Sequence, residues 1–76
     1  MKLQILGPGC PRCKQLLANV QQAVADINDV EIEKVEDIRE IMKFRILATP
    51  ALAVDGVVKA AGRVLSPEEI KKLIAG

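Results

Sequence analysis

The dipeptide Asp55-Gly56 is the feature of this sequence that most constrains its fold. Short runs of alanine, leucine and valine flank it, at residues 51–54 and 57–60. A tight type I′ turn needs positive φ at both central residues, and aspartate followed by glycine meets that need readily. The pattern therefore predicts a β-hairpin, so two neighbouring antiparallel strands must form part of the fold.

The first third of the chain predicts a strand that leads into a helix. Residues 3–6 form a short β-prone run, which Gly7-Pro8-Gly9 ends. From Pro11 onward the apolar residues recur at the spacing of one helix face. The residues expected on this face are Leu16, Leu17, Val20, Val24 and Ile27.

Two further elements are expected before the hairpin. In residues 30–35, Val30 and Ile32 alternate with glutamates, a pattern that favours a half-exposed edge strand protected by charge. Residues 37 to about 45 predict a short second helix. Its apolar side is expected to consist of Ile38, Ile41 and Met42.

The last helix has a complete start signal. Ser66 is a favourable N-cap, Pro67 suits the first helical position, and Glu69 completes a capping box. The buried stripe of this helix is expected to consist of Ile70, Leu73 and Ile74.

Together these patterns predict an α/β fold in the order strand, helix, strand, helix, strand, strand, helix. A right-handed crossover through the first helix makes the first two strands parallel, while the hairpin makes the last two antiparallel. The expected result is a mixed four-stranded sheet with helices on both faces. The length of 76 residues suits a single domain, residues 1–76, and the core must be aliphatic because Phe44 is the sole aromatic residue.

Charge and hydropathy restrict the partners and the location. The chain has 11 basic and 10 acidic residues and a formal net charge of +1, so no strong field steers it to nucleic acid or to an anionic membrane. The apolar run before Gly7 is too short for a signal segment or a membrane span. We therefore expect a cytoplasmic protein.

Cys10 and Cys13 are the candidate reactive residues. Two cysteines this close together stabilise a domain little, so in a reducing compartment the pair is reactive rather than structural. Cys10 stands just before the helix, where free N–H groups, the helix dipole and the cations Arg12 and Lys14 favour a thiolate. Pro11 is preset for the first helical position and fixes the geometry of the pair. Cys10 is expected to attack a disulfide, and Cys13 to resolve the mixed disulfide.

The Cys-Pro-Arg-Cys motif at a helix start, Thr49-Pro50 before the third strand, the hairpin and the closing helix together resemble the thioredoxin/glutaredoxin superfamily. Within it, the chain is similar to the short bacterial and archaeal thioredoxin-like redox-active disulfide proteins. The resemblance implies a thioredoxin-like fold. It also implies a thiol-disulfide oxidoreductase that reduces or exchanges disulfides in a protein partner.

The resemblance further implies roles for single residues. It makes the Thr49-Pro50 bond a cis peptide beside the cysteines, with Thr49 offering backbone hydrogen bonds to an extended substrate. Gly9 stands where thioredoxins have tryptophan, so a less apolar rim is expected. The redox-active Cys10-Cys13 disulfide needs no cofactor and no metal. The implied partners are a disulfide-containing protein and a thioredoxin-reductase-like or other reductant, with the chain itself a monomer.

Other interpretations of the same residues are open. The two thiolates could hold Cu(I) and pass it on, whereas zinc would need four ligands and the chain has no histidine. A non-catalytic thioredoxin-fold adaptor is a further alternative, as are two incidental thiols. Thr49-Pro50 could be an ordinary loop turn, and Arg12 and Lys14 could be ordinary solvated charges.

Overall fold

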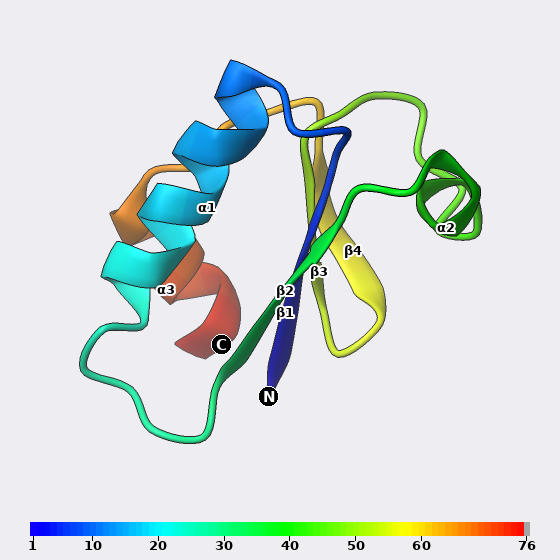
Figure 1. Ribbon diagram of the computed structural model, residues 1–76. Helices are drawn as coiled ribbons and strands as arrows, with labels where there is room; N and C mark the ends of the chain where they lie inside the picture. Colours follow the sequence, from blue (N-terminus) through cyan, green and yellow to red (C-terminus); the bar gives the residue numbers. More distant parts are fainter. Residues whose placement is uncertain (76) are drawn as a thin grey trace.

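The computed structural model describes residues 1–75 and arranges them as four strands and three helices in the expected order (Figure 1). The strands are β1 (Lys2–Leu6), β2 (Glu31–Val35), β3 (Ala51–Val54) and β4 (Val57–Ala61). The helices are α1 (Pro11–Ala23), α2 (Ile38–Met42) and α3 (Pro67–Ala75).

The strands form a mixed sheet in the order β2-β1-β3-β4. β1 and β2 run parallel, with Leu6 opposite Val35, because the α1 crossover returns the chain to the same end of the sheet. β3 pairs antiparallel with both β1 and β4. β2 is therefore an edge strand, and its exposed Glu31 and Glu33 suit that position. This topology confirms the fold class expected from the sequence.

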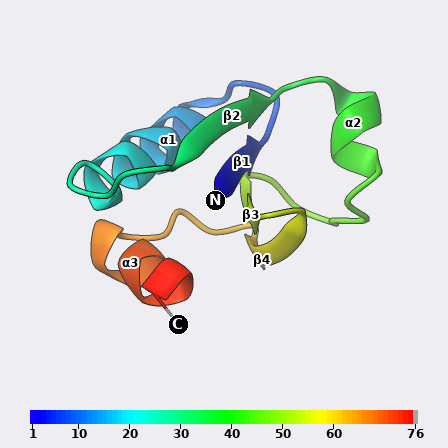
Figure 2. The ribbon, with the colours of Figure 1, turned by 90° about the horizontal axis from the view of Figure 1, so that it is seen from below.

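Helices cover both faces of the sheet (Figure 2). α1 and α3 lie side by side on one face, and α2 lies on the other. Side chains of β3 alternate between the two faces, so Leu52 packs on the α1/α3 side and Ala53 on the α2 side. The larger core, on the α1/α3 side, consists of Leu3, Ile5, Leu16, Val20, Ala23, Val24, Leu52, Val54, Leu65 and Ile70. The smaller core consists of Leu6, Val35, Ile41, Ala51 and Ala53.

The hairpin forms at Asp55-Gly56, as predicted. φ is 50° at Asp55 and 86° at Gly56, so both central residues of the turn lie in the left-handed region. Asp55 also joins the hairpin to β1. Its Oδ1 accepts from the backbone N–H of Lys2 at 2.8 Å, and its own N–H donates to the Lys2 carbonyl oxygen at 2.8 Å. The turn is thus attached to the start of a central strand.

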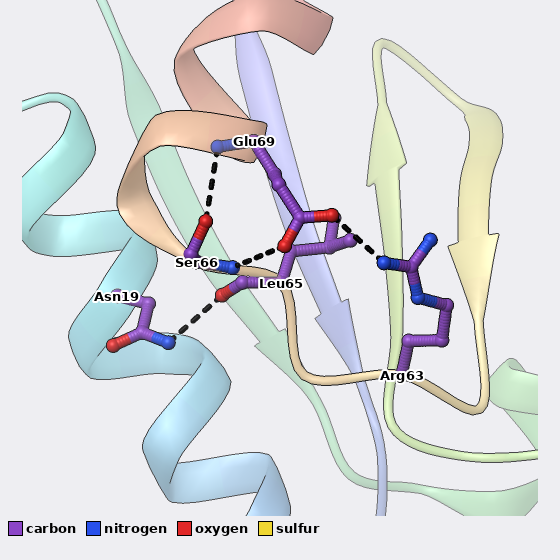
Figure 3. Close-up of polar contacts among 5 residues, drawn as sticks. All are labelled: Asn19, Arg63, Leu65, Ser66 and Glu69. Carbon is purple, nitrogen blue, oxygen red and sulfur yellow. Dashed lines mark hydrogen bonds and ion pairs between the residues drawn. The ribbon is translucent and has the colours of Figure 1, made fainter.

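A capping box stabilises the start of α3, as predicted (Figure 3). The backbone N–H of Glu69 donates to Ser66 Oγ at 3.2 Å, and the backbone N–H of Ser66 donates to Glu69 Oε1 at 3.1 Å. Arg63 forms an ion pair with Glu69 at 2.7 Å. Asn19 on α1 donates to the carbonyl oxygen of Leu65 at 2.8 Å, so α1 holds the segment that enters α3.

Helix α1 is shorter than the apolar spacing predicts. It ends at Ala23, and Val24, its C-cap, is still buried. Ile27 lies in the following turn and is 41% exposed. The expectation that Ile27 lies on the face of this helix is therefore wrong, because the helix ends at Ala23 and the chain turns, with a φ of 61° at Asp29, into β2.

Helix α2 is also shorter than predicted, and one of the three side chains on its apolar side is buried. Ile41 is 4% exposed, but Ile38 and Met42 are 60% and 68% exposed, so the sheet covers only part of this apolar side. The reason lies in the residues after the helix. Phe44 and Ile46 pack against the smaller core and occupy the space over the sheet that a longer helix face would need.

Candidate functional site

The connection between β1 and α1 places both cysteines at one end of the sheet. Residues 7–9 link the two elements, and Cys10 is the N-cap of α1, with a φ of −68° and a ψ of 166°. Pro11 is the first residue of the helix, as expected. The backbone N–H of Cys13 donates to Cys10 Sγ at 3.4 Å. The sulfur of Cys10 therefore takes the position that a serine or aspartate oxygen has in an ordinary helix cap.

Cys10 and Cys13 form a close pair of free thiols, with their sulfurs 2.8 Å apart. Cys13 is 5% exposed, whereas Cys10 is only partly buried. A molecule that approaches from solvent therefore meets the sulfur of Cys10 first, and Cys13 lies behind it.

The surroundings shift the pKa values of the two thiols in opposite directions. The pKa of Cys10 is lowered, first by the hydrogen bond with the Cys13 thiol and then by the one from the Cys13 backbone N–H. The pKa of Cys13 is raised, first by burial and then by its hydrogen bond to Cys10. Because the thiolate is the nucleophile in disulfide exchange, Cys10 is the sulfur better prepared to attack.

Arg12 and Lys14 lie beside the pair, but the lowered pKa of Cys10 comes from hydrogen bonds. The backbone N–H of Arg12 adds one of these bonds. Its guanidinium turns to the carbonyl oxygen of Gly62 instead, to which Nη2 donates at 3.3 Å. Both cationic side chains are exposed, so water and salt screen them. The exposed charges therefore matter less for Cys10 than the sequence suggested.

Gly7 lets the chain close tightly around Cys13. A Cβ at this position would collide with Sγ of Cys13 and would lie 3.8 Å from Cα of Pro50. Pro50 is buried and follows a cis peptide bond from Thr49. Its carbonyl oxygen accepts from the backbone N–H of Gly62 at 2.8 Å. The segment that enters β3 thus comes to the same end of the sheet as the start of α1 (Figure 1).

Comparison with known proteins gives the family. A family model described as a thioredoxin domain matches residues 1–75. A thioredoxin of Methanothermobacter thermautotrophicus is 45% identical over 76 residues, which cover 99% of this chain and 99% of that protein. A thioredoxin of Methanocaldococcus jannaschii is 42% identical over 71 residues, or 92% of this chain and 81% of that protein. The chain belongs to the thioredoxin family.

As a member of the thioredoxin family at this level of similarity, the chain is a thiol-disulfide oxidoreductase. Such proteins act on disulfides and need a reductant to restore their thiols. In the part of the thioredoxin-family chain that the structure describes, no helix is long and apolar enough to cross a membrane. Within the same residues 1–75, no three His, Cys, Asp or Glu side chains are grouped to hold a metal ion.

Three residues near the cysteines of this thioredoxin-family chain were not predicted from the sequence as part of the site. Gly7 makes room for the thiol of Cys13, and Gly62 accepts from Arg12. The carboxylate of Glu36 comes close to the backbone beside Cys10. A glycine in a loop is usually explained by the turn alone. Glu36 could have been suspected, because it directly follows β2 and neighbouring parallel strands end at the same edge of a sheet.

A larger hollow lies on the α2 side of the thioredoxin-family sheet and contains neither cysteine. Its volume is about 570 Å³, and Phe44 and Val58 are among the residues that line it. Charged side chains of α2 and the turn after it, Glu40, Lys43 and Arg45, also line it, together with residues of β1 and β2. This hollow is therefore separate from the end of the sheet at which the cysteines lie.

Proposed function

We propose that Cys10 and Cys13 cycle between dithiol and disulfide and so reduce or exchange disulfides in a protein partner. The observation that supports this most directly is a pair of free thiols 2.8 Å apart, with the pKa of the more exposed one lowered and that of the buried one raised. Such a pair separates the two tasks of an exchange, which are attack on a partner and release of that partner.

In the proposed cycle, the thiolate of Cys10 attacks one sulfur of the partner disulfide. A bond forms between that sulfur and Cys10, and the other partner sulfur leaves as a thiolate. The sulfur of Cys13 then attacks Cys10, which closes the Cys10-Cys13 disulfide and releases the second partner thiol. The partner gains two electrons and two protons, and the cysteine pair loses them.

The neighbouring residues support this cycle in different ways. Pro11 starts the helix whose N–H groups face Cys10. Gly9, with a φ of 88°, lets the chain turn into the cysteine motif. Arg12 and Lys14 place positive charge on the rim, where Arg12 is steadied by the carbonyl oxygen of Gly62.

Thr49 and Pro50 serve as the platform for the substrate chain. Pro50 lies near Gly7, where an added Cβ would be 3.8 Å from Cα of Pro50, and the same Cβ would collide with Sγ of Cys13. Thr49 is half-buried and directly precedes Pro50. A partner segment that pairs with Thr49 in extended form would present its disulfide to Cys10.

The proposal includes the cellular setting. The substrate is a disulfide-containing protein, and an upstream thioredoxin-reductase-like or other reductant restores the dithiol. The whole of residues 1–76 acts as one monomeric domain, with the redox disulfide in place of a cofactor. The cytoplasm is the proposed location, because reductants there keep protein thiols reduced.

Single-cysteine variants test the division of roles. Cys13→Ser should accumulate mixed disulfides with partner proteins, because the intermediate on Cys10 can no longer be resolved. Cys10→Ser should accumulate none, since Cys13 is buried and its pKa is raised. Non-reducing gels and mass spectrometry of both variants measure the adducts. Equal trapping by the two variants, or trapping by neither, would show that the assignment is wrong.

Thiol titration and elemental analysis separate this function from its alternatives. The reduced protein should lose two thiols on mild oxidation and regain both with dithiothreitol, which a non-catalytic adaptor need not do. Protein purified without oxygen should contain no stoichiometric copper after dialysis, whereas retained copper would favour a Cu(I) carrier.

A further inference from the structure

The attack of Cys13 on the mixed disulfide at Cys10 requires a proton acceptor. Cys13 enters this step as a thiol and ends it in a disulfide, so its proton has to leave the buried sulfur. Cys13 is 5% exposed, and bulk water has little direct access to it. A group that accepts this proton close to the sulfur would speed the step.

The two glycines of the loop between β1 and α1 leave space for two chemically different groups. At Gly7, the sulfur of Cys13 occupies the space that a Cβ would need. At Gly9, a Cβ would lie 2.9 Å from Oε2 of Glu36, so the carboxylate approaches the backbone there. The same short loop therefore has the resolving thiol beside its first residue and a carboxylate beside its last.

The position of Glu36 follows from the pairing of β1 with β2. Leu6 lies opposite Val35, and the backbone N–H of Gly7 donates to the Val35 carbonyl oxygen at 3.0 Å. This bond extends the parallel ladder by one step beyond β1. Glu36, the next residue, is thus held against the loop that leads to the cysteines, although it belongs to no regular element.

A small cavity connects the two groups. Its volume is about 50 Å³, and both Cys13 and Glu36 line it. A buried water needs about 10–15 Å³ of such space and two to four polar partners. Lys14 on α1 and Lys34 on β2 also line the cavity. Glu36 is the sole carboxylate among the lining residues.

We propose that Glu36 accepts the proton of the Cys13 thiol through water in this cavity while the mixed disulfide is resolved. The inference rests on the exchange function proposed above. The Cys13 proton passes to water and from water to the Glu36 carboxylate. The resulting thiolate attacks Cys10, the Cys10-Cys13 bond forms, and the bond from Cys10 to the partner sulfur breaks. The departing partner thiolate takes up a proton from solvent, and Glu36 returns its proton to solvent.

A two-step release assay isolates this event. Reduced protein mixed with one equivalent of the chromogenic disulfide dithiobis(nitrobenzoate) releases one coloured thiolate when Cys10 attacks and a second when Cys13 resolves the adduct. The second release is intramolecular, so its rate does not depend on protein concentration. Its dependence on pH reports how Cys13 loses its proton.

Glu36→Gln should slow the second release by at least about tenfold near neutral pH, because the variant depends on hydroxide alone. Its rate should then rise about tenfold per pH unit between about pH 6 and 8, a steeper slope than in the unaltered protein. Glu36→Asp, which keeps the carboxylate, should recover much of the rate. The first release reports attack by Cys10 and shows that the fold is intact.

Glu31→Gln is the matched control, because Glu31 is an exposed glutamate at the opposite end of β2 and the charge change is the same. It should keep the rate and pH slope of the unaltered protein. If Glu36→Gln also keeps both, the inference is wrong while the exchange function stands. If the unaltered protein gives no second release at any pH, the exchange function itself fails.

Discussion

At the scale of single residues, the chemical difference between Cys10 and Cys13 depends on one helix turn. The N-cap position gives Cys10 a hydrogen bond from the Cys13 backbone N–H, and the position one turn later buries Cys13 against the sheet. Two identical side chains thereby acquire opposite pKa shifts. The first cause of the lowered pKa of Cys10 is the Cys13 thiol itself, so the pair tunes its own nucleophile.

Replacing Cys13 by alanine tests this dependence. Cys13→Ala removes the thiol hydrogen bond and keeps the backbone N–H, so the pKa of Cys10 should rise toward its ordinary value. The Cys10 thiolate is then less populated at neutral pH, and its alkylation should slow roughly three- to tenfold. The rate of reaction with iodoacetamide as a function of pH, followed by mass spectrometry, gives the midpoint. An unchanged midpoint would mean that the helix start alone determines the shift.

At the scale of elements, α1 and α3 depend on polar contacts at their ends to pack over the larger core. The capping box of Ser66 and Glu69 begins α3, and Asn19 ties α1 to the chain just before it. Ile70, one turn into α3, is fully buried as a result. α2 is different, because Asp37 caps it at Arg39 but only Ile41 anchors it to the sheet.

The cap of α3 can be measured directly. Ser66→Ala removes the hydroxyl that accepts from the Glu69 N–H, and the free energy of unfolding should fall by about 1 kcal/mol. Ser66→Asp keeps an acceptor at this position and should cost much less. Urea unfolding followed by circular dichroism gives both values. A loss as large for aspartate as for alanine would point to packing at this position rather than to the cap.

At the scale of the whole molecule, two carboxylates connect segments that are far apart in the sequence. Glu33 on β2 accepts from Gln4 at 2.8 Å and pairs with Lys2, and its pKa is lowered first by the Gln4 bond. Glu69 has a lowered pKa because it accepts from the backbone N–H of Ser66 and pairs with Arg63. Both contacts favour the ionised carboxylate in the folded state.

These lowered pKa values predict that the fold is weakened by acid. The unfolded chain binds protons at the ordinary glutamate pKa, about 4.3, and the folded chain at lower pH. The contribution of both carboxylates is therefore complete above that value and is lost as the pH falls through the lowered pKa values. Urea unfolding at neutral pH and at about pH 3 measures the loss. Glu69→Gln should make the difference between the two conditions smaller.

Glu68→Gln is the matched control for this pH dependence, because Glu68 is the exposed neighbour on the same helix turn. It should leave the difference between neutral and acid stability as it is. If Glu69→Gln behaves in the same way, the acid dependence has another source.

Most of the fold could be predicted because its determinants are local. Asp55-Gly56 needs positive φ at adjacent residues, and Ser66 with Glu69 forms a cap within one turn, so each pattern acts over a few residues. The exposed Ile27, Ile38 and Met42 could not be predicted. Their burial depends on where each helix ends and on which later residues cover the same part of the sheet. The spacing of apolar residues in the sequence predicts neither.

By itself, the sequence determined the order of the elements, the hairpin, the helix caps and the placement of Cys10 at a helix start, because these follow from short-range spacing. Tertiary structure alone decided what surrounds the sulfurs. Gly7, Glu36 and Pro50 come from three separate segments. They come close to the cysteine loop only after β1 has paired with β2 and β3. The contact of Arg12 with Gly62 has the same origin. Such contacts between distant segments depend on sheet register, which is a property of strand pairing and not of any single segment.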